Sequence, residues 1–280
     1  MINLSVFSVS PVFASRTTAR GGQTLFPREH GAYGQLAFPV LTSLAVAGVS
    51  ATGLLIALSA AGGFLMHEPV LVLLGRRGVR AKREQGRAAI MSLVAAATIA
   101  IGAGVLSFAW TRPPARWSFA LPLVPAALLV LAIGINHEKR ALGEIAAALS
   151  FSFVSAPLAL ASGAPVREAL SVAIAFGAMF VTTTLAVRVV VLRVRGGGNP
   201  RAERATRLAV LILSSTVVVV LAAATLYGLT PWPTIAAAAP GLIGATGLSL
   251  LPPSPARLRT VGWTLVAASA LAATILIVGL

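Results

Sequence analysis

Histidine and glutamate side chains that stand next to each other are the groups in this sequence best suited to chemistry. The chain has 3 histidines and 7 acidic residues, and every acidic residue is a glutamate. Such neighbours can exchange protons near neutral pH, and histidine is also a common metal ligand. All three histidines occur in pairs of this kind, which are Glu29-His30, His67-Glu68 and His137-Glu138.

The segments that must position these pairs are strongly apolar. Of the 280 residues, 57% are hydrophobic and only 10% are charged, and long apolar runs recur along the whole chain. A bilayer requires each such run to satisfy its own backbone as a helix. We therefore predict an all-α polytopic membrane protein, with a loose or interfacial tail over residues 1–26 and one transmembrane domain over 27–280.

Hydropathy, turn residues and charges predict about nine spans. Residues 32–74 are too long for one crossing, and Gly48 and Gly53 indicate a turn within them. Eight spans, with the first two joined, remain the alternative. The predicted spans are 32–49, 52–74, 88–110, 118–135, 141–161, 170–192, 208–227, 234–251 and 261–278.

Lysine and arginine fall mainly on one side of this topology, which predicts its orientation. The positive-inside rule places the amino terminus and the basic loops in the cytoplasm, and the carboxyl terminus outside. The positive net charge of +15 then needs only an acidic membrane surface as its partner, so a nucleic-acid partner is not expected. The opposite side carries only Arg112, Arg116 and Arg167.

The three histidine pairs all map to the predicted cytoplasmic side and could share one cavity. Glu68 lies about 10 Å inside its span at 1.5 Å per residue, where it must be protonated, paired or hydrated. Pro69 follows and would break the helix there; a simple proline kink is the alternative reading. Arg188 could reach Glu68 or Glu144, although a lone arginine near a helix end more often extends its side chain to the interface. The candidate catalytic residues are Glu29, His30, His67, Glu68, His137 and Glu144.

Basic residues around this side are candidates for binding a phosphate or a lipid headgroup. Arginine can neutralise a phosphate directly, but the positive-inside rule explains basic loops without a ligand. A metal site is unknown, because no two histidines share the spacing of a zinc-binding helix. The candidates for headgroup binding are Arg28, Arg76, Arg77, Lys139, Arg140, Arg188 and Arg193.

The segment "PREHGAYGQLAFPVL" and the later "HEP" resemble the YwiC-like family of bacterial membrane proteins. Pro27 to Tyr33 match its opening signature position by position. A more distant resemblance is to the UbiA-type prenyltransferases, which implies a nine-helix bundle in the bacterial inner membrane and an isoprenoid substrate held by magnesium. The aspartate-rich motifs that bind this magnesium are missing here, because the chain has no aspartate.

Three functions are compatible with these features. The first is binding or modification of an isoprenoid or another lipid in a cavity that faces the cytoplasm. The second is proton-coupled transport of a small molecule, for which paired repeats and a site near the midplane are expected. No internal repeat is evident in the sequence. The third is a membrane scaffold without catalysis.

Overall fold

The computed structural model describes residue 25 and residues 30–135, 140–194, 200–251 and 258–280, and every regular element in these ranges is a helix. The predicted tail over 1–26 lies almost wholly outside them. The helices are α1 (His30–Ala47), α2 (Ala51–Leu65), α3 (His67–Leu73), α4 (Val79–Trp110), the 3₁₀ helix η1 (Pro113–Phe119), α5 (Ala120–Gly134), α6 (Ala141–Phe153), α7 (Ser155–Ala161), α8 (Val166–Val194), α9 (Pro200–Leu226), α10 (Trp232–Leu250) and α11 (Leu258–Gly279).

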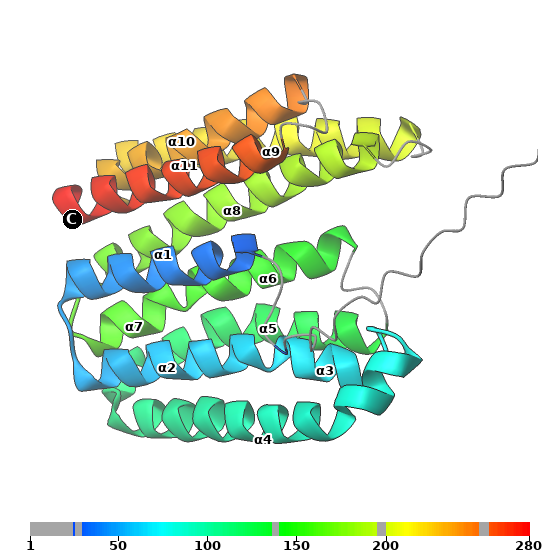
Figure 1. Cartoon of the computed structure of the whole chain (residues 1–280). Helices are drawn as coiled ribbons and strands as arrows, with labels where there is room; N and C mark the ends of the chain where they lie inside the picture. The colour runs from blue at the N-terminus through cyan, green and yellow to red at the C-terminus, as the bar shows by residue number, and fades with distance from the viewer. Residues whose placement is uncertain (1–24, 26–29, 136–139, 195–199, 252–257) are drawn as a thin grey trace, which may run out of the picture.

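In the part of the chain that the structure describes, nine apolar helical segments run along the bundle, which agrees with the predicted spans. Within the described ranges, 8 helical segments are long and apolar enough to span a membrane, and the ninth, Gly31–Ala47, is shorter. Figure 1 shows α1 and α2 running in opposite directions. Gly48, with a φ of 80°, ends α1, and the Ser50 hydroxyl accepts a hydrogen bond from the backbone N–H of Gly53 at the start of α2. The first two spans are therefore separate.

Two helices begin well before the predicted spans. Helix α4 begins at Val79 instead of 88, and α9 begins at Pro200 instead of 208. The predicted boundaries followed the first apolar residue, whereas arginine, lysine and glutamate favour helix in water as well. The pair Arg80 and Glu84, with Nε and Oε1 2.8 Å apart, supports the extra turns of α4.

The alternating directions of the spans gather most basic residues at one end of the bundle. We call this the basic end; it is where α1 begins and α8 ends, on the right of Figure 1. The other end is called the opposite end, and Arg112, Arg116 and Arg167 lie there. Described residues of the basic end are Arg76, Arg77, Arg80, Lys82, Arg83, Arg87, Arg140, Arg188, Arg193, Arg201, Arg204, Arg207 and Arg259.

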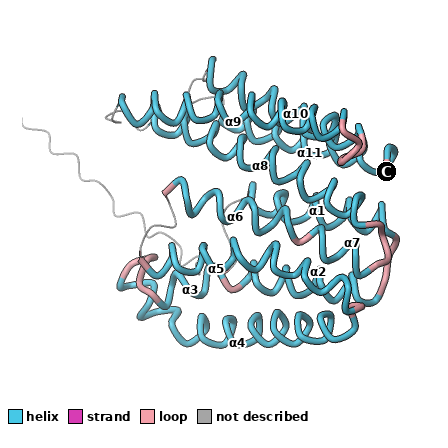
Figure 2. Tube along the Cα trace, turned by 180° about the vertical axis from the view of Figure 1, so that it is seen from behind, coloured by secondary structure: helices cyan, strands magenta, loops and turns pink. Residues whose placement is uncertain are grey.

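Helix α8 is the centre of the bundle. It packs against α10, α6, α9, α7 and α1, and two opposite views show it between the α9–α11 layer and the remaining helices (Figures 1 and 2). Phe176 and Met179 of α8 are fully buried in the largest apolar cluster. A polar side chain on α8 is therefore surrounded by protein over most of the helix.

Two spans are broken by proline. Pro69 and Pro157 have no N–H to donate to the carbonyls of Leu65 and Phe153, and the helices break there into α2 and α3 and into α6 and α7. The predicted break at Pro69 is thus found.

Replacing Gly163 by alanine should lower the free energy of unfolding by about 1–2 kcal/mol, the cost of placing an L-residue in the left-handed region. Gly163 ends α7 with a φ of 99°. Thermal and denaturant unfolding in detergent measure the effect. Gly244→Ala in α10 is the control, because an added Cβ meets nothing within 4 Å there. An equal result for both variants would contradict the turn described here.

Candidate functional site

Glu68 and Arg77 form a buried ion pair at the basic end. Glu68 is only 1% exposed. Arg77 donates from Nε to Oε1 at 2.7 Å and from Nη2 to Oε2 at 2.5 Å, a bidentate arrangement. Gly75 and Gly78, with φ of 75° and 95°, turn the chain between α3 and α4 so that Arg77 folds back onto α3. Glu68 is therefore paired, one of the three states expected for an acid at this depth.

Glu144 and Arg188 form a second pair, between α6 and α8. Arg188 Nη1 donates to Glu144 Oε1 at 3.0 Å, and the two side chains are 24% and 32% exposed. Glu144 is one of the two partners considered for Arg188 from the sequence. The pair is less buried than that of Glu68 and Arg77, so a ligand from the basic end could reach it.

A hydrogen bond between two uncharged side chains lies next to this pair, toward the middle of the bundle. Gln35 of α1 donates from Nε2 to Thr184 Oγ1 at 3.2 Å. Thr184 lies one turn before Arg188 on α8, so both side chains face the same side of that helix. Gln35 and Thr184 were not predicted as site residues, although the spacing of Thr184 and Arg188 on an apolar helix was a usable signal. We call Gln35, Thr184, Arg188 and Glu144 the polar strip.

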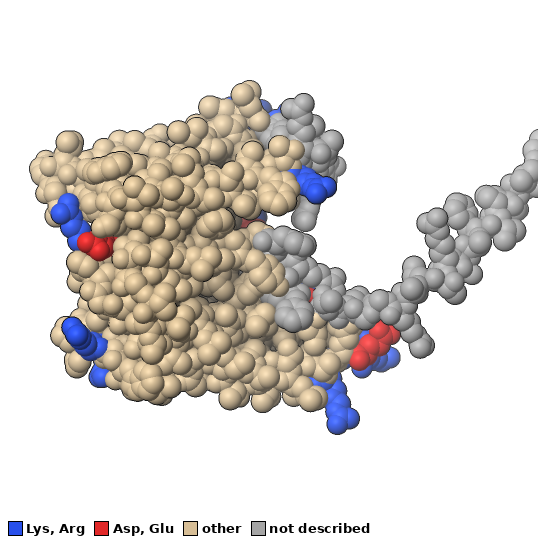
Figure 3. Space-filling model, turned by 60° about the vertical axis from the view of Figure 1, so that its left-hand side comes forward, with Lys and Arg blue, Asp and Glu red and all other residues tan. Residues whose placement is uncertain are grey.

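Charged side chains of the described residues gather at the two ends of the bundle. Figure 3 shows lysine, arginine and glutamate atoms near these ends, with an uncharged face between them. Since the polar strip joins α1, α6 and α8 at this end of the bundle, charged groups are available there to a molecule that enters between helices.

The other predicted site residues fall into three groups. Arg76 donates from Nη2 to the carbonyl of Ile133 at 3.2 Å and so satisfies a carbonyl in the last turn of α5. His67 is half-buried at the break before α3, and Arg140 and Arg193 are exposed. His30 begins α1, but its side chain is not described. Arg28, Glu29, His137 and Lys139 lie outside the described residues.

The described part of the site thus contains two separate pairs. Glu68 is bound within the α3–α4 connection, while Glu144 is bound across α6 and α8. Among the residues that the structure describes, no three histidine or carboxylate side chains come together as a metal site. The shared cavity expected for all three histidine pairs stays a prediction.

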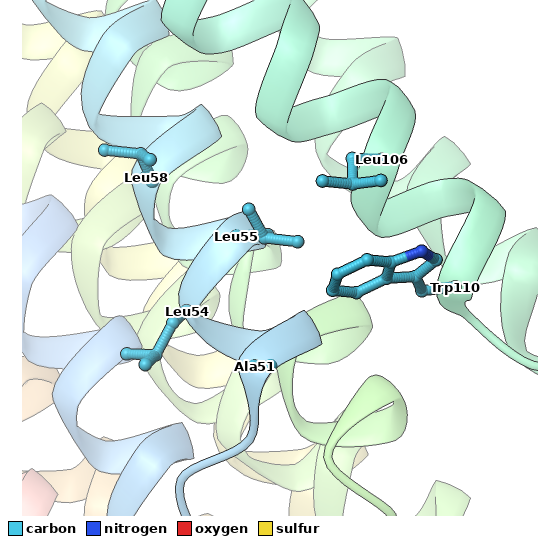
Figure 4. A pocket seen from close by; sticks show the side chains of 6 residues that line it. All are labelled: Ala51, Leu54, Leu55, Leu58, Leu106 and Trp110. Atoms are coloured by element: carbon cyan, nitrogen blue, oxygen red, sulfur yellow. The ribbon is translucent and has the colours of Figure 1, made fainter.

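An apolar groove lies at the opposite end, between α2 and α4. Its volume is about 300 Å³, and Figure 4 shows leucine side chains and the Trp110 ring along it. Such a surface suits a lipid acyl chain and offers no charged group for chemistry. The lining residues are Ala51, Leu54, Leu55, Leu58, Leu106 and Trp110.

The fold and the charge distribution define a multi-pass α-helical membrane protein. Residues 26–160 match the model of the family described as YwiC-like protein, which confirms the resemblance carried by "PREHGAYGQLAFPVL". The matched stretch runs from before α1 to the end of α7 and includes Glu68, Arg77 and Glu144 but not Arg188. The chain matches no curated protein. It also matches no solved structure, so the distant UbiA-type resemblance stays a prediction.

Proposed function

We propose that this membrane protein binds the phosphate-bearing headgroup of a membrane lipid, an isoprenoid lipid by chemical class, in the polar strip at the basic end. The observation that carries the proposal is Arg188, a quarter exposed on the central helix α8 and oriented by Glu144. A guanidinium that is partly exposed and oriented by a carboxylate is suited to donating to a phosphate as well. Gln35 supplies a further polar group beside it.

Binding is favoured over group transfer by the state of the carboxylates. A magnesium-assisted transfer from a diphosphate needs several carboxylate oxygens around the metal. Glu68 gives both of its oxygens to Arg77, and Glu144 already binds Arg188. We place the protein in the bacterial inner membrane with the basic end in the cytoplasm, because basic residues there meet anionic lipid headgroups.

Replacing Arg188 by methionine should abolish retention of such a lipid, because the charge that faces the headgroup is removed while an unbranched side chain similar to the aliphatic part of arginine is kept. Native mass spectrometry of protein purified from its membrane measures the bound mass. Arg167→Met is the matched control, since Arg167 is exposed at the opposite end of the same helix. Wild-type and Arg167→Met protein should both carry a phosphorus-containing lipid.

Further results of the same measurement show whether the bound phosphate belongs to a lipid or is a free anion. A bound mass that disappears on delipidation and returns with inorganic phosphate would identify a free anion as the ligand. Wild-type protein without any bound phosphate compound, or Arg188→Met protein that retains it, would overturn the proposal.

A further inference from the structure

The two proline-broken spans are one backbone unit used twice. The breaks at Met66 and Val154, the prolines Pro69 and Pro157, and the glycines Gly75 and Gly163 correspond at one constant offset along the chain. Both glycines have positive φ, 75° and 99°. The next helix, α4 or α8, begins shortly after each glycine.

Three backbone hydrogen bonds of one segment have counterparts at the same offset in the other. Each short helix begins with a bond back to the residue at the break and ends in a glycine turn with paired bonds from the two residues that close it. The matched N–H to O bonds are Val70 to Met66 at 3.1 Å and Leu158 to Val154 at 3.3 Å, Gly75 to Val72 at 3.0 Å and Gly163 to Leu160 at 3.1 Å, and Arg76 to Leu71 at 2.9 Å and Ala164 to Ala159 at 3.0 Å.

The packing that follows is also repeated. We call α2, α3 and α4 the first unit and α6, α7 and α8 the second unit. In the first unit α2 and α3 both pack against α4, and in the second unit α6 and α7 both pack against α8. In each unit the break therefore allows a longer helix and a short helix to pack against the same third helix.

The two units run in opposite directions. Helices α2 and α3 lead from the opposite end to the basic end, whereas α6 and α7 lead from the basic end to the opposite end (Figure 1). We read the two units as an inverted repeat of backbone geometry, which is not evident in the sequence. Proline and glycine set this backbone geometry, whereas most other side chains differ between the two units.

Charged pairs and close backbone contacts lie inside each unit. Glu68 and Arg77 tie the end of α3 to the turn before α4, and Glu144 and Arg188 tie α6 to α8. Gly62 of α2 lies so near the α4 backbone that an added Cβ would stand 2.9 Å from the nitrogen of Ala100. Each unit is thereby held as one body.

Two contacts of neutral side chains join the units. The hydroxyls of Ser50 and Ser162 are 2.8 Å apart at the opposite end. The rings of Phe64 and Phe151 meet edge to face with centroids 5.6 Å apart, and these residues precede the two breaks. The breaks therefore face each other between the two bodies.

We infer that the two units move against each other and carry across the bilayer the phosphate-bearing molecule that Arg188 binds, so that the protein is a transporter. This inference rests on the proposed function. Inverted repeats with interrupted helices in corresponding positions are the architecture of alternating access, and the interruptions mark the passage. Here the passage runs by Phe64 and Phe151, and Arg188 lies at its entrance from the basic end.

Engineered disulfides test this movement, because the chain contains no cysteine. Ser50→Cys with Ser162→Cys joins the two units. Ser59→Cys with Gly104→Cys is the matched control inside the first unit, since a Cβ at Gly104 would lie 3.9 Å from the Ser59 Cβ, within disulfide range. Each variant is reconstituted in vesicles of phosphatidylethanolamine and phosphatidylglycerol and measured oxidised and reduced.

Two probes distinguish the form in which the phosphate crosses. One is a polyprenyl phosphate with a fluorophore on its isoprenoid chain, whose transfer between leaflets exposes it to a membrane-impermeant quencher, and the other is radiolabelled inorganic phosphate, counted inside the vesicles. We expect oxidation to abolish transfer of one probe by the Ser50/Ser162 variant, reduction to restore it, and the Ser59/Gly104 variant to transfer it in both states.

Transfer that persists when Ser50 and Ser162 are linked would overturn the movement of the two units. Wild-type vesicles that move neither probe would overturn transport itself. The binding measurement on Arg188→Met is independent of both results, so a failure of transport with lipid still bound leaves the proposed function standing.

Discussion

Replacing Glu68 by glutamine should lower the free energy of unfolding by about 3 kcal/mol, near the lower limit for breaking a buried ion pair. The substitution keeps the size of the side chain but leaves the guanidinium of Arg77 beside a neutral group at a site that is 1% exposed. Reversible unfolding of the detergent-solubilised protein, followed by circular dichroism, measures the change.

Glu84→Gln is the matched control for Glu68. Glu84 also pairs with an arginine, Arg80, but their side chains are 58% and 89% exposed. An exposed pair is screened by water and contributes little to stability, so the control should unfold almost as the wild type does. A second variant, Glu68→Met with Arg77→Met, should recover much of the loss because no buried charge remains. Equal losses in Glu68→Gln and Glu84→Gln would show that Glu68 is not buried.

Replacing Gly62 by alanine should cost about 1–3 kcal/mol, the range for an overpacked contact. The added Cβ would stand 2.9 Å from Ala100 N and 3.0 Å from Ala96 O. These are backbone atoms of α4, which cannot rotate away as the end of a side chain can, so α2 and α4 must separate. The free energy of unfolding in detergent measures the cost.

Gly63 is the control position, because alanine there changes helix propensity without adding a contact with α4. It lies in the same helix, and an added Cβ meets nothing within 4 Å. Gly63→Ala should stabilise the protein by up to about 1 kcal/mol, since alanine favours helix over glycine. A Gly62→Ala variant as stable as Gly63→Ala would mean that α2 and α4 do not approach as closely as described.

Gly62 and the ion pair of Glu68 and Arg77 hold the first unit together at two different places. Gly62 sets the distance between α2 and α4 within the membrane, while Glu68 and Arg77 close the turn between α3 and α4. Loss of either contact would loosen the body that the inferred movement requires to be rigid. The inter-unit serine contact has no such role, which is why the disulfide experiment changes it alone.

Hydropathy and charge were enough to predict the class of protein, the nine spans and the gathering of basic residues at one end. Both signals are local, because a segment of about 20 residues must itself be apolar to lie stably across a bilayer, whatever its neighbours are. The break at Pro69 was predictable for the same reason, since proline disrupts a helix through its own ring.

The partners of the charged groups depended on the tertiary structure. Glu68 pairs with Arg77 in the turn that follows α3, and Arg188 pairs with Glu144 on another helix. From the sequence, either Glu68 or Glu144 was a possible partner for Arg188. Gln35 and Thr184, far apart in the chain, meet only because α1 packs against α8. The inferred inverted repeat was also not visible in the sequence, because it lies in backbone geometry that two prolines and two glycines set. The side chains around them pack against different helices in the two units, and only the tertiary structure determines these neighbours.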